Sequence, residues 1–508
     1  MTLPSGPTLT PPPPPEGRRY ERLVLGVVFA AIMMTAIDTT AVILALPTMI
    51  HDLSTTLVTG IWIIMAYLLV LATIGTQVGR LGDMFGRVRV FNAGFFVFTI
   101  ASLFCALATS GPEIIAFRVV QGVGGAMLFA NSGAIIADTF PPRRRGAAYG
   151  LTSIGYSTGA ILGILLGGIL TTFSTWRGIF LLNLPVGIVA GVIGYYVLAE
   201  RSPRISRRLD IEGMALLTVG LTLLLTGLTY TAGFGYSEAY GLTLVVGAVV
   251  LVAFVAWEAR FAREPLLDLK LLRRWSLTAS VFAAFFQSTA NLAVLFVVIM
   301  YLQGVRALSP FDASILLVPG YLLGAVIAPF AGRASDHWGA RVVASLGLAS
   351  SVAGIMVYST LGIDTTVVLV VLGSIVSGAG NSAFYPANNS EVMTAAPGSS
   401  YGVASGLLRM FTNVGTVCSF AIALLVVSLS IPRSAAFSIF LGVLNLDPSL
   451  YGPFTAGMRA VLYVAIAFDA VALILSVLRG RRVVAPPTPD RPGVSRSHAT
   501  GSPPPSAE

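Results

Sequence analysis

The sequence predicts an all-α membrane protein with fourteen transmembrane helices. Of its 508 residues, 55% are hydrophobic and only 10% are charged, and the mean hydropathy is +0.85. Such values are typical of a chain that crosses a bilayer many times. An apolar run of about 20 residues can span the hydrocarbon core. Fourteen such runs follow one another, at 23–46, 57–78, 90–109, 113–137, 146–170, 176–198, 211–231, 238–258, 276–302, 311–331, 341–361, 366–387, 401–429 and 459–478.

The basic residues indicate how these spans are oriented. Twenty-three of the 31 fall on one predicted side of the membrane, whereas Arg177, Arg306, Arg433 and Arg459 fall on the other. Because basic loops tend to stay in the cytoplasm, we expect a cell-membrane protein with both chain ends cytoplasmic. The net charge of +9 then reflects orientation, and no nucleic-acid partner is expected.

An eleven-residue segment occurs almost twice, each time between two apolar runs. Residues 79–89 read GRLGDMFGRVR, and residues 332–342 read GRASDHWGARV. Such a repeat predicts two related halves that move against each other, as in many secondary transporters. The expected organisation is a disordered tail (1–17), a six-helix bundle (18–205), an inserted helix pair (206–260), a second six-helix bundle (261–482) and a disordered tail (483–508).

Each copy of the repeat places an acid before a helix start. Such an acid can cap the helix N–H groups and pair with nearby arginines. These pairs are expected to hold the halves together on the cytoplasmic side, although the arginines could also simply follow the charge bias. The predicted gating residues are Gly79, Asp83, Gly86 and Arg87 in the first copy and Gly332, Asp336, Gly339 and Arg341 in the second.

Ionisable side chains inside a span are costly and usually functional. Asp38 and Arg118 lie about 12 Å and about 7 Å from the same membrane face at 1.5 Å per residue, so their side chains could meet. They form either a structural ion pair or a proton site, in which Arg118 lowers the pKa of Asp38 when close and desolvation raises it when they separate. Asp469 is a second proton candidate, or a partner of Arg409 or Arg459.

Two further patterns concern packing and cargo. Gly155, Gly159, Gly163 and Gly167 form a small-residue stripe on one helix face, which allows close backbone approach. Scattered polar and aromatic residues could line an apolar pocket for lipophilic substrates, or could equally be packing residues. These are Trp62, Tyr67, Asn131, Tyr156, Phe285, Phe286, Gln287, Asn291, Asn381, Phe384, Tyr385 and Asn388.

Several motifs together resemble the major facilitator superfamily and, within it, the fourteen-helix drug:proton antiporter group. The repeated segment resembles the superfamily's loop motif. Residues 38–47 and 118–126 are similar to the group's first-helix and fourth-helix motifs, and residues 301–303 to the end of its ninth helix. Its sixth-helix entry is similar to Trp176-Arg177 with Phe180, Asn183, Pro185 and Gly187.

The resemblance implies the major facilitator fold, with two six-helix bundles plus two inserted helices, and a proton-coupled multidrug efflux antiporter. It implies that Asp38 is the coupling carboxylate and Arg118 its modulator. The glycine stripe is similar to the family's antiporter motif, a dry sliding seam between the halves. Ile164 stands where that motif usually has proline.

No residue set for catalysis, metal or ATP binding is apparent. The single lysine, Lys270, lies outside any phosphate-binding loop, and no histidine pair has metal-ligand spacing. We expect a monomeric non-enzyme without cofactors, whose partners are lipophilic small molecules, protons and membrane lipid. One alternative is a same-fold exporter of a siderophore, metabolite or lipid. Another is an antiporter-like subunit of a respiratory complex, but such subunits have lysines and glutamates buried in the middle of their spans, and this sequence has neither.

Overall fold

The computed structural model describes residues 17–140, 142–201, 204, 208–396, 401–430, 449 and 451–479. Within these residues, fourteen helices are long and apolar enough to cross a membrane, which confirms the predicted number. The predicted disordered tails lie outside them, apart from Gly17. The helices are α1 (Arg18–Asp52), α2 (Leu57–Phe85), α3 (Arg87–Leu107), α4 (Gly111–Thr139), α5 (Pro142–Phe173), α6 (Arg177–Val197), α7 (Ile211–Phe234), α8 (Glu238–Arg260), α9 (Trp275–Met300), α10 (Pro310–Trp338), α11 (Ala340–Ser359), α12 (Val368–Ala395), α13 (Tyr401–Ser430) and α15 (Tyr451–Leu478).

Most helices extend beyond the apolar runs that predict them. The predicted span 459–478, for example, belongs to α15, which already begins at Tyr451. A hydropathy window detects only the part that matches the hydrocarbon core, whereas backbone hydrogen bonding continues into the interface. Several ends are fixed by short polar caps, since Thr56, Ser237 and Ser309 each accept a bond from a backbone N–H of the first turn of α2, α8 and α10.

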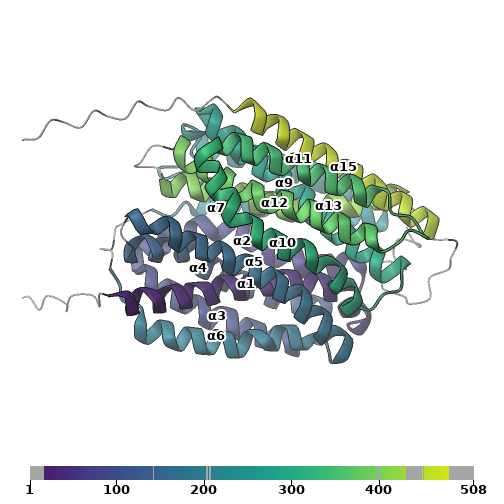
Figure 1. Ribbon diagram of the computed structural model, residues 1–508, viewed down its shortest axis with the longest axis horizontal. Coiled ribbons are helices and arrows are strands. Elements are labelled where there is room, and N and C mark those ends of the chain that lie inside the picture. The colour runs from purple at the N-terminus through teal and green to yellow at the C-terminus, as the bar shows by residue number, and fades with distance from the viewer. Residues whose placement is uncertain are drawn as a thin grey trace, which may run out of the picture.

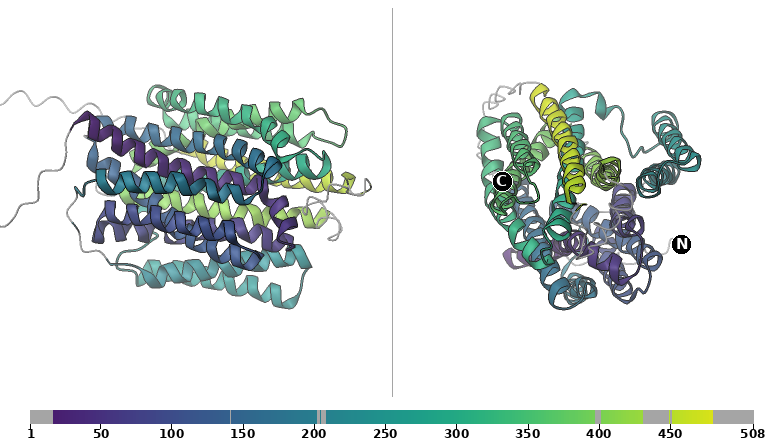
Figure 2. Two further views of the ribbon diagram at one scale, coloured as in Figure 1. Left: turned by 90° about the horizontal axis from the view of Figure 1, so that it is seen from below. Right: turned by 90° about the vertical axis from the view of Figure 1, so that its right-hand side faces the viewer.

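The helices pack as two lobes (Figure 1). The first lobe comprises α1 to α6, and the second comprises α9 to α13 and α15. Seen along the helix axes, α7 and α8 lie at one side of the two lobes (Figure 2, right). Helix α7 packs against both α2 and α13, and the indole N–H of Trp62 on α2 donates to Thr229 Oγ1 on α7 at 3.2 Å. The inserted pair is therefore fastened at the boundary between the lobes.

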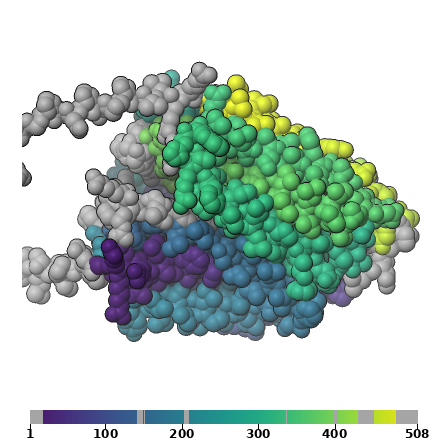
Figure 3. Space-filling model, viewed as in Figure 1, coloured from purple at the N-terminus to yellow at the C-terminus, as the bar shows by residue number. Residues whose placement is uncertain are grey.

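Helix α1 begins and α15 ends toward the same end of the molecule, on the left of Figure 1. We call this end the tail face and the opposite end the far face. The purple-to-blue first lobe and the green-to-yellow second lobe make a broad contact in the space-filling view (Figure 3). Because every helix crosses between the two faces, polar contacts near either face decide how the lobes meet.

Polar and aromatic contacts join the lobes near the far face. Helix α9 continues into a π-helical turn, Tyr301–Val305, from which Gln303 Nε2 donates to the carbonyl of Leu44 on α1 at 3.0 Å. The backbone N–H of Phe311 on α10 donates to Thr172 Oγ1 on α5 at 3.1 Å, and the Phe173 and Phe311 rings meet edge-on. Toward the tail face, Arg409 of α13 donates to the carbonyl of Phe129 on α4.

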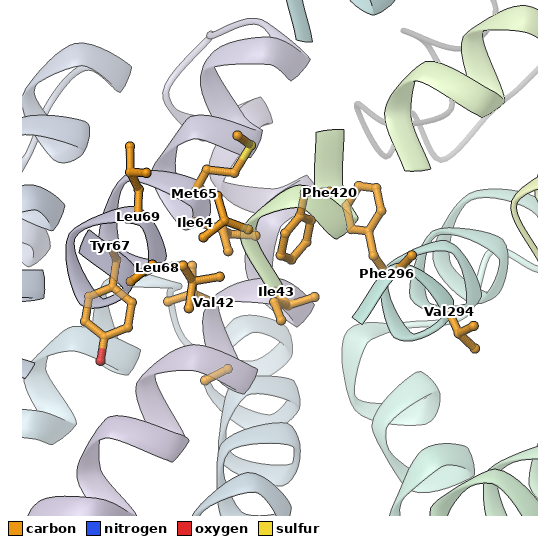
Figure 4. Packing of buried hydrophobic residues seen from close by; sticks show 14 of the residues in the cluster. Val42, Ile43, Ile64, Met65, Tyr67, Leu68, Leu69, Val294, Phe296 and Phe420 are labelled. Carbon is orange, nitrogen blue, oxygen red and sulfur yellow. The ribbon is translucent and has the colours of Figure 1, made fainter. Parts of the chain in front are cut away.

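Between these contacts the apolar core runs without interruption from one lobe to the other. Phe420 of α13 and Phe296 of α9 lie beside Ile43 of α1 and Ile64 of α2 (Figure 4). All four side chains are at most 1% exposed. Burying this surface stabilises the pairing of the lobes in the present conformation, because the side chains interdigitate rather than slide freely.

The glycine stripe of α5 packs against α1, inside the first lobe. A Cβ at Gly159 would lie 2.6 Å from the carbonyl oxygen of Met33, and one at Gly163 would lie 2.7 Å from that of Ile37. Gly155 and Gly167 likewise face α1. The prediction that these four glycines form the seam between the halves is therefore wrong. It is the next residue, Gly168, that faces α10, with its Cβ position 3.0 Å from Phe311 Cα.

We expect Gly163→Ala to destabilise the protein, because its methyl group would overlap Thr40 Oγ1 and the backbone of α1. Such overpacking typically costs about 1–3 kcal/mol. Gly75→Ala is the matched control, since no atom would lie within 4 Å of the new Cβ. The melting temperatures of the purified variants in detergent check this, and equal values for both would contradict the packing account.

Candidate functional site

Asp38 of α1 and Arg118 of α4 form a buried ion pair. Arg118 Nη1 lies 2.5 Å from Asp38 Oδ2, and neither side chain has any exposed surface. The structure thus brings together the two residues whose depths along the sequence matched. A charge-assisted bond in a water-free interior is strong, but removing one partner leaves the other charge uncompensated, at a cost of about 3–5 kcal/mol.

Two amides and a hydroxyl complete the surroundings of the carboxylate. Gln121 Nε2 and Asn183 Nδ2 donate to Asp38 Oδ1 at 2.8 and 3.2 Å. Both amides also donate to Ser102 Oγ, at 2.8 and 3.3 Å, and Gln121 Oε1 accepts from Arg118 Nη1 at 2.7 Å. The site therefore draws on α1, α3, α4 and α6. Gln121 lies in the fourth-helix motif but was not predicted to bind Asp38, and Ser102 was not predicted at all, since a neutral polar residue in a span gives no sign of its partner.

Arg118 is held on its other sides by backbone and aromatic rings. Its Nε donates to the carbonyl of Ile63 at 3.0 Å, and its guanidinium lies 4.3 Å from the centroid of the Tyr67 ring. Tyr67, a predicted substrate residue, has no exposed surface and belongs to the surroundings of the ion pair in this structure. Arg118 Nη2 is buried and has no hydrogen-bond partner within the described part of the chain. Any proton that reaches Asp38 would therefore leave a strongly uncompensated cation, so protonation must be accompanied by rearrangement.

The first copy of the repeated segment forms a charge cluster inside the first lobe. Arg87, at the start of α3, lies 2.8 Å from Asp83 of α2 and 2.7 Å from Asp138 of α4. The predicted capping role of Asp83 is wrong, because Glu200 accepts from the backbone N–H groups of Arg87 and Val88 at the start of α3. The cluster also does not hold the two halves together as predicted, because Asp83, Arg87 and Asp138 all belong to the first lobe.

Other residues of the repeat shape the turns or hold the chain that follows α8. Gly86 and Gly339 have φ values of +115° and +88°, which a residue with a side chain rarely adopts, and each ends one helix and begins the next. Arg80 donates to the carbonyls of Glu264 and Pro265 at 2.7 and 2.8 Å. No atom lies within 4 Å of a Cβ placed on Gly332. The side chain of Asp336 lies outside the described part of the structure, and Arg341 lies in the first turn of α11.

Asp469 of α15 is buried in the second lobe without a basic partner among the described residues. Ser351 Oγ of α11 donates to Asp469 Oδ2 at 2.6 Å, and no described residue forms a hydrogen bond with Asp469 Oδ1. In the structure Asp469 does not pair with Arg409 or Arg459, the alternative that the sequence left open. Arg459 donates to the carbonyl of Leu361 and Arg409 to that of Phe129.

Three predicted substrate residues form an amide chain next to Asp469. Gln287 Nε2 of α9 donates to Asn381 Oδ1 of α12 at 2.6 Å, and Asn381 Nδ2 donates to Asn291 Oδ1 at 2.6 Å. Ser351 Oγ also lies 3.2 Å from Asn381 Oδ1, which connects the chain to the acid. The rings of Phe286 and Phe468 lie nearby on the same helices as Gln287 and Asp469, with centroids 5.8 Å apart.

Tyrosines connect this cluster with the first lobe. Tyr385 of α12 lies in the neighbourhood of Asp469 and of Tyr156 of α5. Tyr156 is 49% exposed, and its neighbours include Tyr67 of α2 and Tyr321 of α10. A half-exposed residue with neighbours in both lobes lies at the boundary between them. The structure thus gathers Tyr156, Tyr385 and the amide chain around this boundary.

The remaining predicted substrate residues occupy packing positions. Asn131 and Phe384 are each 1% exposed, and Asn388 donates to the carbonyl of Ser280. Phe285 packs against Phe411, and Trp62 bonds to α7 as described above. Two apolar surface grooves, one between α1 and α6 and one along α8, contain none of the predicted substrate residues.

The sequence matches a family model throughout its helical part. Residues 28–420 and 282–503 match the model described as Major Facilitator Superfamily. The chain is 32% identical over 416 residues to the tetracenomycin C resistance and export protein of Streptomyces glaucescens, an alignment that covers 81% of this chain and 76% of that protein. It is 27% identical to the riboflavin transporter RibZ of Clostridioides difficile, over 77% of this chain and 85% of that protein. Further relatives are named as multidrug resistance proteins.

The fold is also that of a solved transporter. A bacterial homologue of the human lysosomal transporter Spinster, in an inward-facing and unoccupied conformation, superposes with a TM-score of 0.65. The superposition covers 91% of this chain and 98% of that one at 16% sequence identity. At this identity the likeness establishes the arrangement of the helices, and no detail of a site.

We expect Arg87→Ala to lower thermal stability, because Asp83 and Asp138 would then face each other without a cation. Hydrogen bonds to charged groups are each worth about 1.5–3 kcal/mol, and partial exposure of this cluster places the loss toward the lower value. Arg89→Ala is the matched control, since Arg89 is exposed two residues further along α3. Thermal melts of both variants in detergent give the comparison, and a loss as large for Arg89→Ala would refute the assigned role.

Proposed function

The chain belongs to the major facilitator superfamily, and on this basis we propose that it is a proton-coupled multidrug efflux antiporter of the cell membrane. It is a multi-pass membrane protein whose relatives include exporters of antibiotics and multidrug resistance proteins. The proposed cargo is a lipophilic compound, with cations among the substrates, that leaves the cytoplasm by alternating access of the two lobes. The tail face is then the cytoplasmic one.

The observation that carries the proton-coupling proposal is the buried Asp38–Arg118 pair. With Asp38 ionised, the pair is neutral and its amides are satisfied. Proton binding would end the attraction to Arg118, and the four helices around the site would have to rearrange. Helix α1 can carry that change directly, because Leu44, six residues beyond Asp38, accepts the bond from Gln303 of the second lobe.

The charge cluster and the glycines are proposed to serve the motion rather than the chemistry. Arg87 with Asp83 and Asp138 would keep α2, α3 and α4 moving as one body near the tail face. The stripe from Gly155 to Gly167 would hold the Asp38 segment of α1 on α5 at close range. The cargo is proposed to lie where Tyr156, Tyr385 and the amides of α9 and α12 gather.

A second candidate cargo is a metabolite, because RibZ, which is named a riboflavin transporter, aligns over 77% of this chain. The ring-bearing cluster of the second lobe suits a planar heterocycle as well as a drug. Export of a siderophore or a lipid remains a further alternative on the same fold.

Accumulation of ethidium, tetracenomycin C and riboflavin in cells with and without the protein tests the function. We expect lower accumulation of at least the first two when the protein is present, and loss of that difference when a protonophore collapses the proton gradient. Lower accumulation of riboflavin, with no change for the other two compounds, would favour the metabolite candidate. Efflux that persists with the protonophore would contradict proton coupling.

We expect Asp38→Asn to abolish proton-driven ethidium efflux while the protein still inserts into the membrane. The reason is that asparagine cannot bind and release a proton, although it can keep part of the hydrogen bonding to Gln121. Asp364→Asn is the control, since Asp364 is an exposed acid in the loop before α12. The measurement is ethidium uptake into everted vesicles after their interior is made acidic, and unimpaired uptake with Asp38→Asn would contradict this assignment.

A further inference from the structure

We propose that Asp469 is a second proton-carrying group, and that Ser351 relays its protonation to Asn381, where a hydrogen-bond donor of the cargo competes with the proton. This inference rests on the proposed export function and specifies how one of its sites would recognise cargo. It concerns a site in the second lobe, separate from the Asp38–Arg118 pair, and the class of compound bound there.

The first step is that Asp469 faces no compensating charge. Among the described residues its only hydrogen-bond partner is Ser351, and Asp469 Oδ1 is buried without a partner. A carboxylate in such surroundings is costly unless a proton or a cation joins it. Helix α9, against which α15 packs, has no acid, base or histidine. On α15 itself the other ionisable residues are Tyr451, Arg459 and Tyr463. On the elements around α15 they are Tyr301 on the π-helical turn, Arg341 and Tyr358 on α11, Tyr385 on α12, and Tyr401, Arg409 and Cys418 on α13.

The second step is that Ser351 has one hydroxyl proton and two acceptors within reach. Asp469 Oδ2 lies 2.6 Å from Ser351 Oγ, and Asn381 Oδ1 lies 3.2 Å from it on the other side. A hydroxyl donates only one hydrogen bond. When Asp469 is ionised, the shorter and charge-assisted bond to Asp469 takes the proton. When Asp469 is protonated, its own O–H can donate to Ser351 Oγ, and Ser351 can then donate to Asn381.

The third step is that the direction of the Ser351 hydrogen bond determines whether an acceptor position on Asn381 Oδ1 is occupied. The carbonyl oxygen of an amide accepts two hydrogen bonds. Gln287 Nε2 supplies one of them to Asn381 Oδ1 at 2.6 Å, while Asn381 Nδ2 is occupied by Asn291 Oδ1. The second position on Asn381 Oδ1 is filled by Ser351 when Asp469 carries a proton, and is open to another donor when Asp469 is ionised.

The open position defines the cargo chemistry. Asn291 and Asn381 are only partly buried, so the amide chain leads from an accessible region to the enclosed acid. Phe286 and Phe468, next in sequence to Gln287 and Asp469, place two rings 5.8 Å apart between α9 and α15 that could pack against an aromatic skeleton. The site therefore suits a lipophilic aromatic compound with an N–H or O–H donor, such as an arylamine or a phenol. Proton and cargo would exclude each other there, which is the requirement for antiport.

Two lipophilic cations test the relay in purified protein. Ethidium has amine N–H donors, whereas tetraphenylphosphonium has none and reports only the electrostatic effect of Asp469. We expect ethidium binding to weaken as the pH falls, by up to about tenfold per pH unit for one competing proton, and more steeply than tetraphenylphosphonium binding. In Ser351→Ala the slope for ethidium should fall to that of tetraphenylphosphonium, and in Asp469→Asn both slopes should decrease and become equal.

Ser350→Ala is the matched control, because Ser350 is the adjacent hydroxyl on α11 and donates to the carbonyl of Val376. It should keep the slopes of the unmodified protein. The relay is overturned if Ser351→Ala keeps the steeper ethidium slope, or if Asp469→Asn leaves either slope unchanged.

An infrared pH titration without cargo separates this inference from the transport function. Asp469→Asn should remove one component of the protonated-carboxyl band, Ser351→Ala should shift that component, and Ser350→Ala should leave it unchanged. A band that Asp469→Asn leaves unaltered overturns the relay even if export is proton-coupled. The expected bands in a protein that exports nothing would instead support the proton site and contradict the proposed function.

Discussion

A charge cannot remain uncompensated in the core of a bilayer, and the first lobe is organised around meeting that constraint at Asp38. Arg118 neutralises it, Gln121 and Asn183 donate to its other oxygen, and Ser102 accepts from both of these amides. These partners fix the rotation of α1 about its own axis. The close approach of the α5 glycines fixes its distance on another side. Position and ionisation state of one carboxylate are therefore tied to the packing of the whole lobe.

The buried acids of the two lobes have different surroundings. Asp38 has a cation and amide donors, whereas Asp469 has one hydroxyl and an oxygen without a partner among the described residues. The asymmetry follows from composition, because the helices that enclose Asp469 place serine and amides where α4 places arginine. One lobe is thus stabilised by a salt bridge, and the other by hydrogen bonds whose direction can reverse.

The sequence predicts the features that depend on position along a helix, and misses those that depend on its rotation. Hydropathy gives the fourteen spans because membrane thickness sets their length, and depth alone suggests that Asp38 and Arg118 could meet. Periodicity shows that the α5 glycines share a face. It does not show whether that face meets α1 or the other lobe, and the seam prediction failed for that reason. Likewise, Glu200 caps α3 across a distance of 113 residues in sequence, which no local pattern reveals.

In the proposed mechanism, both acids act on the same contact near the far face. Asp38 lies on α1, whose Leu44 carbonyl accepts from Gln303, and Asp469 lies on α15, which packs along α9 directly before the π-helical turn that contains Gln303. π-helical turns often mark functional positions, because they rotate side chains out of the regular helical register. Closely packed helices transmit small shifts as rigid bodies rather than absorbing them. A proton at either acid would therefore change the geometry of the hydrogen bond between Gln303 and Leu44. Through this contact, protonation in one lobe would affect the other lobe.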